Sequence, residues 1–156
     1  MRKRILDFLA ALASTVLVVS IAIAVNTAVA ASVARDDTAR VTKILHKMQQ
    51  VMGGGARAIT IEVETTDEVN AYATSAYSII ITTGMLAEVR NDNELAVIIG
   101  HELAHHTLGH IEYAMTIYGT GAVMEGLFLN NVALETAADL MGMQIAAMAG
   151  YDECAS

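Results

Sequence analysis

The sequence predicts an α+β domain, mainly helical with a small sheet, preceded by an N-terminal hydrophobic helix. Residues 8–34 carry no charge and are mostly Ala, Leu, Val and Ile. Short segments between residues 59 and 82 are rich in Ile, Val and Thr, which is typical of strands. Runs rich in Ala, Leu, Ile and Met at 95–105 and 134–150 indicate helices. A chain of 156 residues is expected to hold one such domain.

The N-terminal segment begins with the basic residues Arg2, Lys3 and Arg4 and continues into the apolar run. Two interpretations stay open. A secretory signal would be cleaved after Ala30, which ends a site of the small-x-small type. An uncleaved membrane anchor would use residues 5–34, which are long enough to cross a bilayer.

Either interpretation divides the chain into residues 1–34, a signal peptide or membrane anchor, and residues 35–156, the folded domain. Because basic flanking residues stay on the cytoplasmic side, the domain is expected to be membrane-anchored or periplasmic, and in both cases extracytoplasmic. The net charge of −8 at pH 7 argues against nucleic-acid binding. The one cysteine, Cys154, excludes a disulfide within the chain.

The folded domain is predicted to begin with a packing helix over 36–52, where apolar residues recur at helical spacing. Residues 59–64 alternate between apolar and polar and predict a strand. Further strands are expected at Tyr72 and over 79–82, followed by a short helix over 85–89.

The most informative segment is His101-Glu-Leu-Ala-His105, on the next predicted helix. Asn91 can cap this helix, and Glu94 at the third helical position can reach back to the cap. Positions i and i+4 share one helix face, so the two histidines can hold one zinc ion. Glu102 can then act as general base toward a water that the zinc activates.

A third zinc ligand is expected from the helix over 134–150. Glu135 can reach the metal, which gives three protein ligands and leaves one position for water, as in catalytic zinc sites. Asp139 lies four residues later on the same face and can accept a hydrogen bond from a ligand histidine. One Zn²⁺ per chain is therefore the expected cofactor.

The other histidines near the motif are not expected to bind the metal. His110 follows His105 by five residues, about 140° round a helix, so it should face away from the zinc. We predict that His106 and His110 either support the ligands or lie at the surface. Residues 119–129 carry three glycines among apolar residues and form either a lid over the site or a membrane-facing hairpin.

These segments together resemble the HtpX-like zinc metallopeptidases, the family that includes CaaX prenyl proteases and periplasmic quality-control metalloproteases. The resemblance covers residues 59–152 and is specific because several short pieces occur in the family's order. They are Asn70-Ala-Tyr-Ala73, the strand and turn over 79–86, the stretch from Glu94 to His105, Glu135-Thr-Ala-Ala-Asp139, and Ala149-Gly-Tyr-Asp152.

The resemblance implies a zincin-like (gluzincin) domain in which His101, His105 and Glu135 bind zinc. It also implies that Glu102 is the catalytic acid/base and that Asp139 supports a ligand. The sequence departs from the family after Ala73: it has Thr74-Ser-Ala-Tyr77 where the family carries a turn of the Pro-Gly-Gly type.

The expected function is that of a zinc-dependent metalloendopeptidase, which hydrolyses peptide bonds in membrane or envelope protein quality control. Its partners would be extended or misfolded protein or peptide substrates, and a substrate segment could add as a strand along Tyr77–Ile81. Tyr113 and Tyr118 are candidates for stabilising the oxyanion. Two alternatives remain: a metal-binding but inactive adaptor or chaperone-like relative, and a membrane-anchored interaction module in which the motif is accidental.

Overall fold

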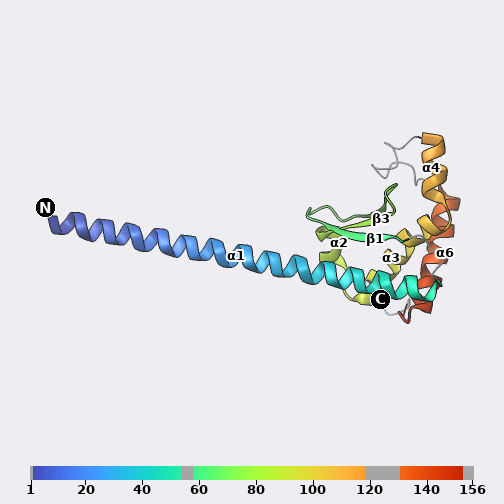
Figure 1. The fold of residues 1–156 in the computed structure, drawn as a ribbon, viewed down its shortest axis with the longest axis horizontal. Coiled ribbons are helices and arrows are strands. Elements are labelled where there is room, and N and C mark those ends of the chain that lie inside the picture. The colour runs from blue at the N-terminus through green and yellow to red at the C-terminus, as the bar shows by residue number, and fades with distance from the viewer. Residues whose placement is uncertain (1, 54–57, 119–130, 153–156) are drawn as a thin grey trace. The chain divides into compact units, whose positions relative to one another are not determined.

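A computed structural model of the chain describes residues 2–53, 58–118 and 131–152 (Figure 1). The described residues are mainly helical with a small sheet, and the N-terminal part is an apolar helix, as the sequence predicts. Two compact units are distinguished, Met1–Asp36 and Asp37–Ser156. In chain order the elements are α1 (Arg2–Val51), β1 (Thr60–Glu64), β2 (Ala71–Ala73), β3 (Ser78–Thr82), α2 (Thr83–Glu88), α3 (Asp92–Thr107), α4 (His110–Tyr118) and α6 (Val132–Met148).

Helix α1 is continuous over 50 residues, whereas the sequence suggested an apolar segment and a separate helix over 36–52. In its first part the apolar side chains of Val19, Ile23 and Val29 are all more than half exposed. By length and composition the stretch Val19–Val51 could cross a membrane, although a signal sequence would pass the same test. The last turns instead belong to the core of the second unit, where they bury Val41, Ile44, Leu45 and Met48.

The sheet has the strand order β1-β3-β2. β1 runs parallel to β3, with Ile61 opposite Ile79, and β2 runs antiparallel to it, with Tyr72 opposite Ile80. β3 is therefore the central strand, and the prediction that a substrate adds along Tyr77–Ile81 is wrong, because both of its sides are already paired. Pairing joins segments that are distant in sequence, so local alternation does not reveal which strand lies at an edge.

The core of the second unit forms where one face of the sheet meets α1, α3 and α6. Ile79 and Ile81 of β3 are two residues apart, so they point to the same face, and both are completely buried. The helices contribute further fully buried side chains, among them Ile44, Met48, Leu95, Ile99, Leu103, Ile145 and Ala146. This packing fixes α3 between the sheet and α6.

The start of α3 is set by the predicted cap. Asn91 has extended backbone geometry, and its side-chain oxygen accepts hydrogen bonds from the backbone N–H groups of Asn93 (2.8 Å) and Glu94 (3.1 Å). The carboxylate of Glu94 reaches back one residue further than predicted. It accepts from the backbone N–H of Arg90 (2.8 Å), so the reciprocal bond lies just outside the helix.

The turn between β2 and β3 contacts α3 through Tyr77. This residue has φ of 60°, in the left-handed region that tyrosine rarely adopts. Its ring stacks on the imidazole of His106, with centroids 6.0 Å apart and ring planes at 29°. His106 Nε2 also lies 3.2 Å from the carbonyl oxygen of Ser78, which it can reach as a donor. His106 thus supports the joint between the helix and the sheet.

Candidate metal centre

Helix α3 carries three of the predicted site residues within its last two turns. His101 is half-buried, Glu102 is only 7% exposed and His105 is completely buried. Their depth follows from the sequence before them, because Leu95, Ala96 and Ile99 are buried in the core and keep the helix against the sheet and α6. Of these three side chains, that of His101 is the most accessible to water.

Helix α6 approaches α3 through a pair of glycines. A Cβ added at Gly100 would lie 2.5 Å from the carbonyl oxygen of Gly142, and one at Gly142 would lie 2.5 Å from the backbone nitrogen of His101. Both positions have ordinary helical backbone, so glycine is needed for space, not for conformation. The two backbones touch directly beside His101, and this contact brings the first turns of α6 within reach of the histidines.

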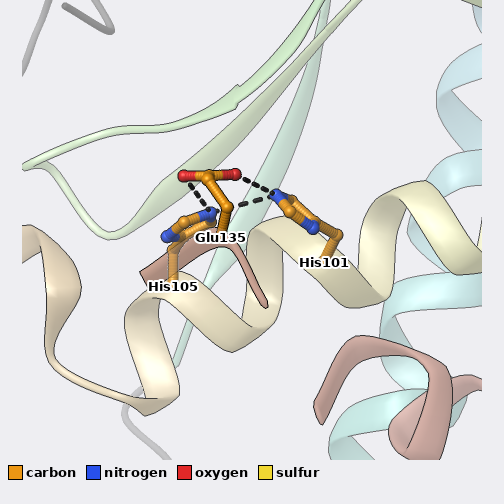
Figure 2. Close-up of side chains that lie close together, drawn as sticks. All are labelled: His101, His105 and Glu135. Atoms are coloured by element: carbon orange, nitrogen blue, oxygen red, sulfur yellow. Dashed lines mark hydrogen bonds and ion pairs between the residues drawn. The ribbon is translucent and has the colours of Figure 1, made fainter. Parts of the chain in front are cut away.

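Glu135, in the first turn of α6, lies against both histidines of α3 (Figure 2). The Nε2 atoms of His101 and His105 are 3.0 Å apart. Glu135 Oε2 is 3.2 Å from His101 Nε2, and Glu135 Oε1 is 3.7 Å from His105 Nε2. All three side chains therefore converge on one small volume.

This spacing fits a zinc ion. Zinc bonds of 2.0–2.1 Å in tetrahedral geometry hold neighbouring ligand atoms roughly 3.3 Å apart. The three observed separations fall on both sides of that value. In addition, Glu135 Oε1 is buried without a hydrogen-bond partner among the described residues. Two imidazoles and one carboxylate are also the donor set that zinc accepts in catalytic sites.

Asp139 lies one turn after Glu135 on α6 and contacts His101 from the other side of its ring. Its Oδ1 is 2.8 Å from His101 Nδ1, at hydrogen-bond distance. If His101 binds a metal through Nε2, the proton of the neutral ring sits on Nδ1 and is donated to this carboxylate. The sequence placed Asp139 in this role but gave no indication of which histidine it would contact.

Burial governs the ionisation of the two deepest groups. It raises the pKa of the Glu102 carboxyl to about 8, with a hydrogen bond from the Ala73 backbone N–H acting in the opposite direction and the charge of Glu135 adding to the rise. A divalent cation nearby would lower this pKa. Burial likewise lowers the pKa of His105 to about 3, assisted by His101 and other neighbouring histidines. His105 is therefore neutral and has a lone pair to offer.

Glu102 also has an unused acceptor. Its Oε2 is buried and has no hydrogen-bond partner among the described residues. The contact with Ala73 comes from β2, so the edge strand of the sheet lies against this carboxylate. No local pattern in the sequence indicates this contact, because it depends on β2 being the outer strand.

His110 lies beside a ligand histidine, on the Nδ1 side of the His105 ring, which is one of the two positions predicted for it, but the helix used to place it is not continuous. That prediction assumed one helix through both residues, but α3 ends at Thr107 and Gly109 turns the chain with φ of 71°. His110 begins α4, is 6% exposed, and places its Nδ1 3.0 Å from Nδ1 of His105. The Leu-Gly pair after Thr107 was the available signal, since glycine commonly ends helices.

The structure gives less information on the predicted oxyanion-stabilising tyrosines and on the predicted lid or hairpin. Tyr113, a candidate for stabilising the oxyanion, is 54% exposed on α4. The side chain of Tyr118, the second candidate, and the proposed lid or hairpin over 119–129 lie outside the described residues, apart from the Tyr118 backbone at the end of α4.

Comparison with known proteins identifies the family to which the chain belongs. The sequence model of Peptidase family M48 matches residues 35–148. The chain is similar to the mitochondrial metalloendopeptidase OMA1 of Arabidopsis thaliana, 31% identical over 115 residues, which is 60% of this chain and 24% of that protein. It is also similar to the Escherichia coli (strain K12) metalloproteases LoiP, 32% identical over 85 residues, and YcaL, 33% identical over 70 residues.

The match with LoiP covers 54% of this chain and 32% of that protein, and the match with YcaL covers 44% and 27%. The chain thus spans about a quarter to a third of the length of these relatives. The family match extends through α3 and α6 and so contains every residue of the candidate metal centre. It confirms the resemblance to HtpX-like metallopeptidases seen in the sequence: the chain belongs to peptidase family M48.

Proposed function

We propose that this chain is a zinc-dependent metalloendopeptidase with a zincin-like (gluzincin) domain. His101, His105 and Glu135 would hold one Zn²⁺, Glu102 would act as the catalytic acid/base, and Asp139 would orient His101. The observation that carries the proposal is the convergence of donor atoms from His101, His105 and Glu135 at a spacing close to tetrahedral. The buried Glu102 lies next to them, on the same helix as the two histidines. Membership of a peptidase family supports hydrolysis as the reaction.

The chemistry follows from the positions of the side chains. A zinc ion in this site would act as a Lewis acid and lower the pKa of a water molecule. Glu102 accepts a proton from the attacking water as its oxygen bonds to the scissile carbonyl carbon. It then delivers that proton to the nitrogen as the C–N bond breaks. Burial raises the pKa of the Glu102 carboxyl and a bound cation would lower it, so the two opposing effects would let this group both accept and release a proton near neutral pH.

The proposed path of the substrate is the outer edge of β2. Thr74 donates to the Ser78 carbonyl and Thr82 donates to the Asn70 carbonyl, so the even-numbered residues of β2 face β3. In an antiparallel pair the intervening residues direct their N–H and C=O groups to the opposite side. Ala71, which is half-buried, can therefore pair with an extended substrate. Ala73 is buried and its N–H contacts Glu102, so the open part of this edge ends close to the catalytic residue.

The location of the enzyme is part of the same proposal. Residues 1–34 would serve as a signal peptide or membrane anchor, and residues 35–156 as the catalytic domain. The exposed apolar side chains of α1 before residue 36 support contact with lipid or with the secretion machinery. An enzyme held there, recognising the backbone of extended segments, would suit quality control of misfolded membrane or envelope proteins.

The test is cleavage of unfolded casein by the full chain in detergent, with metal content measured by mass spectrometry. We expect cleavage, one zinc per chain, and loss of activity on chelation. Glu102→Gln should retain zinc and lose activity by at least about 100-fold, the usual contribution of a general acid/base. The same substitution at the exposed Glu62 of β1 should leave activity unchanged and is the matched control.

Different failures have different meanings. If both proteins bind one zinc and neither cleaves, the chain is an inactive metal-binding adaptor or chaperone-like relative. If the wild-type chain folds and carries no metal, the proposed centre itself is refuted. If Glu102→Gln cleaves at the wild-type rate, another group is the base.

A further inference from the structure

The fully buried histidine of the metal centre has a second imidazole against it. His105 Nδ1 and His110 Nδ1 are 3.0 Å apart, and the rings meet edge to face with centroids at 5.1 Å. His105 is completely buried and His110 is 6% exposed, so water has little access to this contact. Two nitrogens at this distance share one proton, because two N–H groups would repel and two lone pairs would leave both unsatisfied.

The direction of the hydrogen bond follows from the position of the other donor atoms. His105 Nε2 faces His101 and Glu135, whereas its Nδ1 faces His110. A metal-binding imidazole is neutral and uses the nitrogen that carries no proton. With Nε2 on the metal, the His105 proton must sit on Nδ1, so His110 Nδ1 is the acceptor and the His110 proton sits on Nε2.

We propose that His110 is a positioning residue, which accepts the Nδ1 proton of His105 and so fixes that ring with Nε2 presented to the metal. The inference rests on the proposed zinc site and adds to it a residue from a separate helix. His101 has the more usual arrangement, in which a carboxylate, that of Asp139, takes the Nδ1 proton.

The difference between the two acceptors has an electrostatic reason. Asp139 has a side chain that is 63% exposed, so its charge remains hydrated. A carboxylate in the place of His110 would be a buried anion beside His105, and burying a charge is unfavourable without a full set of partners. An imidazole supplies the same acceptor without a charge.

The surroundings of His110 hold it in place. Gly109 reverses the chain after α3, and its carbonyl accepts from the backbone N–H of Tyr113, which closes the first turn of α4. Ile111 and Ala114, both 1% exposed, pack against Ala73 of β2. The first turn of α4 is therefore fixed to the edge strand, which holds the backbone of His110 beside His105.

The experiment compares His110→Leu with His110→Asn in the full chain in detergent. The readout is the zinc dissociation constant, measured by competition with a chromophoric chelator. Leucine fills space but accepts nothing, and we expect it to weaken zinc binding by about 10–100-fold. Asparagine places its side-chain oxygen near the position of Nδ1, and we expect it to restore affinity to within about threefold of the wild type. His106→Leu is the matched control, since it removes a half-buried histidine that contacts Ser78 instead of a ligand.

A second measurement does not depend on a variant that folds. Nitrogen-15 NMR of the zinc-bound wild-type chain reports which ring nitrogen of each histidine carries the proton. We expect His105 protonated on Nδ1 and His110 on Nε2; the reverse tautomer of His110 overturns the inference. So does a wild-type zinc affinity in His110→Leu, or an equal loss in His110→Asn and His110→Leu. A folded wild-type chain that binds no zinc refutes the proposed function as well, so the two failures are distinct.

Discussion

The two sides of α3 hold the metal centre by different means. Toward α6, the contact is made by bare backbone at Gly100 and Gly142, and the functional side chains there, Glu135 and Asp139, are partly open to water. Toward β2 and α4, the contact is made by buried side chains, and Glu102, like His110 beyond it, is almost inaccessible. The open side carries carboxylates that stay hydrated, whereas the closed side carries groups that are neutral at neutral pH when no metal is present.

The two sides of α3 therefore contribute different properties to the metal centre. Charged ligands and acceptors are tolerated where water can solvate them, and they attract the cation. The closed side supplies a low-dielectric wall, which strengthens the field of a bound ion and keeps Glu102 protonatable near neutral pH. Substitutions on the two sides should therefore fail in different ways.

The largest effect is expected from Glu135→Gln, on the open side. The amide keeps the shape of the side chain but loses the charge that the ion needs. Zinc affinity should fall by more than about 100-fold, beyond the range for loss of a supporting residue. Competition with a chelator measures it, with Gln144→Ala, an exposed change on the same helix, as control. An affinity within threefold of the wild type would show that the third ligand lies elsewhere.

Next comes Gly142→Ala, which tests the backbone contact. In an exposed helix this change stabilises by about 1 kcal/mol, because alanine favours helix. Here the added Cβ meets the backbone of His101, so α6 must move away, at a cost of about 1–3 kcal/mol. Urea denaturation should show a loss of stability, and zinc affinity should fall because Glu135 moves with α6.

The sign of the change in the free energy of unfolding is decisive for Gly142→Ala. A rise in stability would mean that α3 and α6 are not in backbone contact. Gly100→Ala crowds the same contact from the other helix. The double variant should therefore lose less stability than the sum of the two single variants.

These contacts also show which parts of the site can be predicted from the sequence. The i and i+4 spacing of His101 and His105 is local, so the helix face that carries them follows from the sequence alone, and so does the cap at Asn91. Glu135 and Asp139 were recognisable because they repeat the same spacing on a second helix. The crossing of α3 and α6 cannot be recognised in the sequence, because it depends on two small residues, Gly100 and Gly142, that meet only in the folded chain.

The errors have a common physical origin. The composition of β3 suits an edge strand as well as a central one, and only long-range pairing places it in the centre. The helix assumed to run through His105 and His110 ends at Thr107 instead, because one glycine, Gly109, redirects the chain. In both cases a local pattern was extended across a point where a non-local contact or a single backbone angle decides the geometry.

On the closed side, we expect Glu102 to make the stability of the metal-free protein depend on pH, as measured in the presence of a chelator. The Glu102 carboxyl ionises near pH 4.5 in the unfolded chain and near pH 8 in the folded one. Between these values the folded state holds one proton more, so stability should fall as pH rises, by up to about 1.4 kcal/mol per pH unit. Glu102→Gln cannot ionise and should remove this part of the slope.

The measurement is urea denaturation of both proteins between pH 5 and 8 in chelator. His105, His106 and His110, whose pKa values burial lowers, act in the opposite direction, but they are present in both proteins. The difference between the two curves therefore isolates Glu102. Parallel curves would mean that its carboxyl is hydrated in the folded protein, and the closed side would not be closed.

The smallest effect is expected from Asp139→Asn. The amide oxygen can still accept the proton of His101 Nδ1, and water can reach this side chain, so the loss should be about tenfold in zinc affinity, the lower end of the range for such partners. His110→Leu should cost more, although His110 carries no charge, because no water can replace it beside His105. Measured side by side, the two variants separate charge from burial as the property that matters. If Asp139→Asn weakens zinc binding more than His110→Leu, the charge of the acceptor outweighs its burial, and the distinction drawn between the two sides of α3 fails.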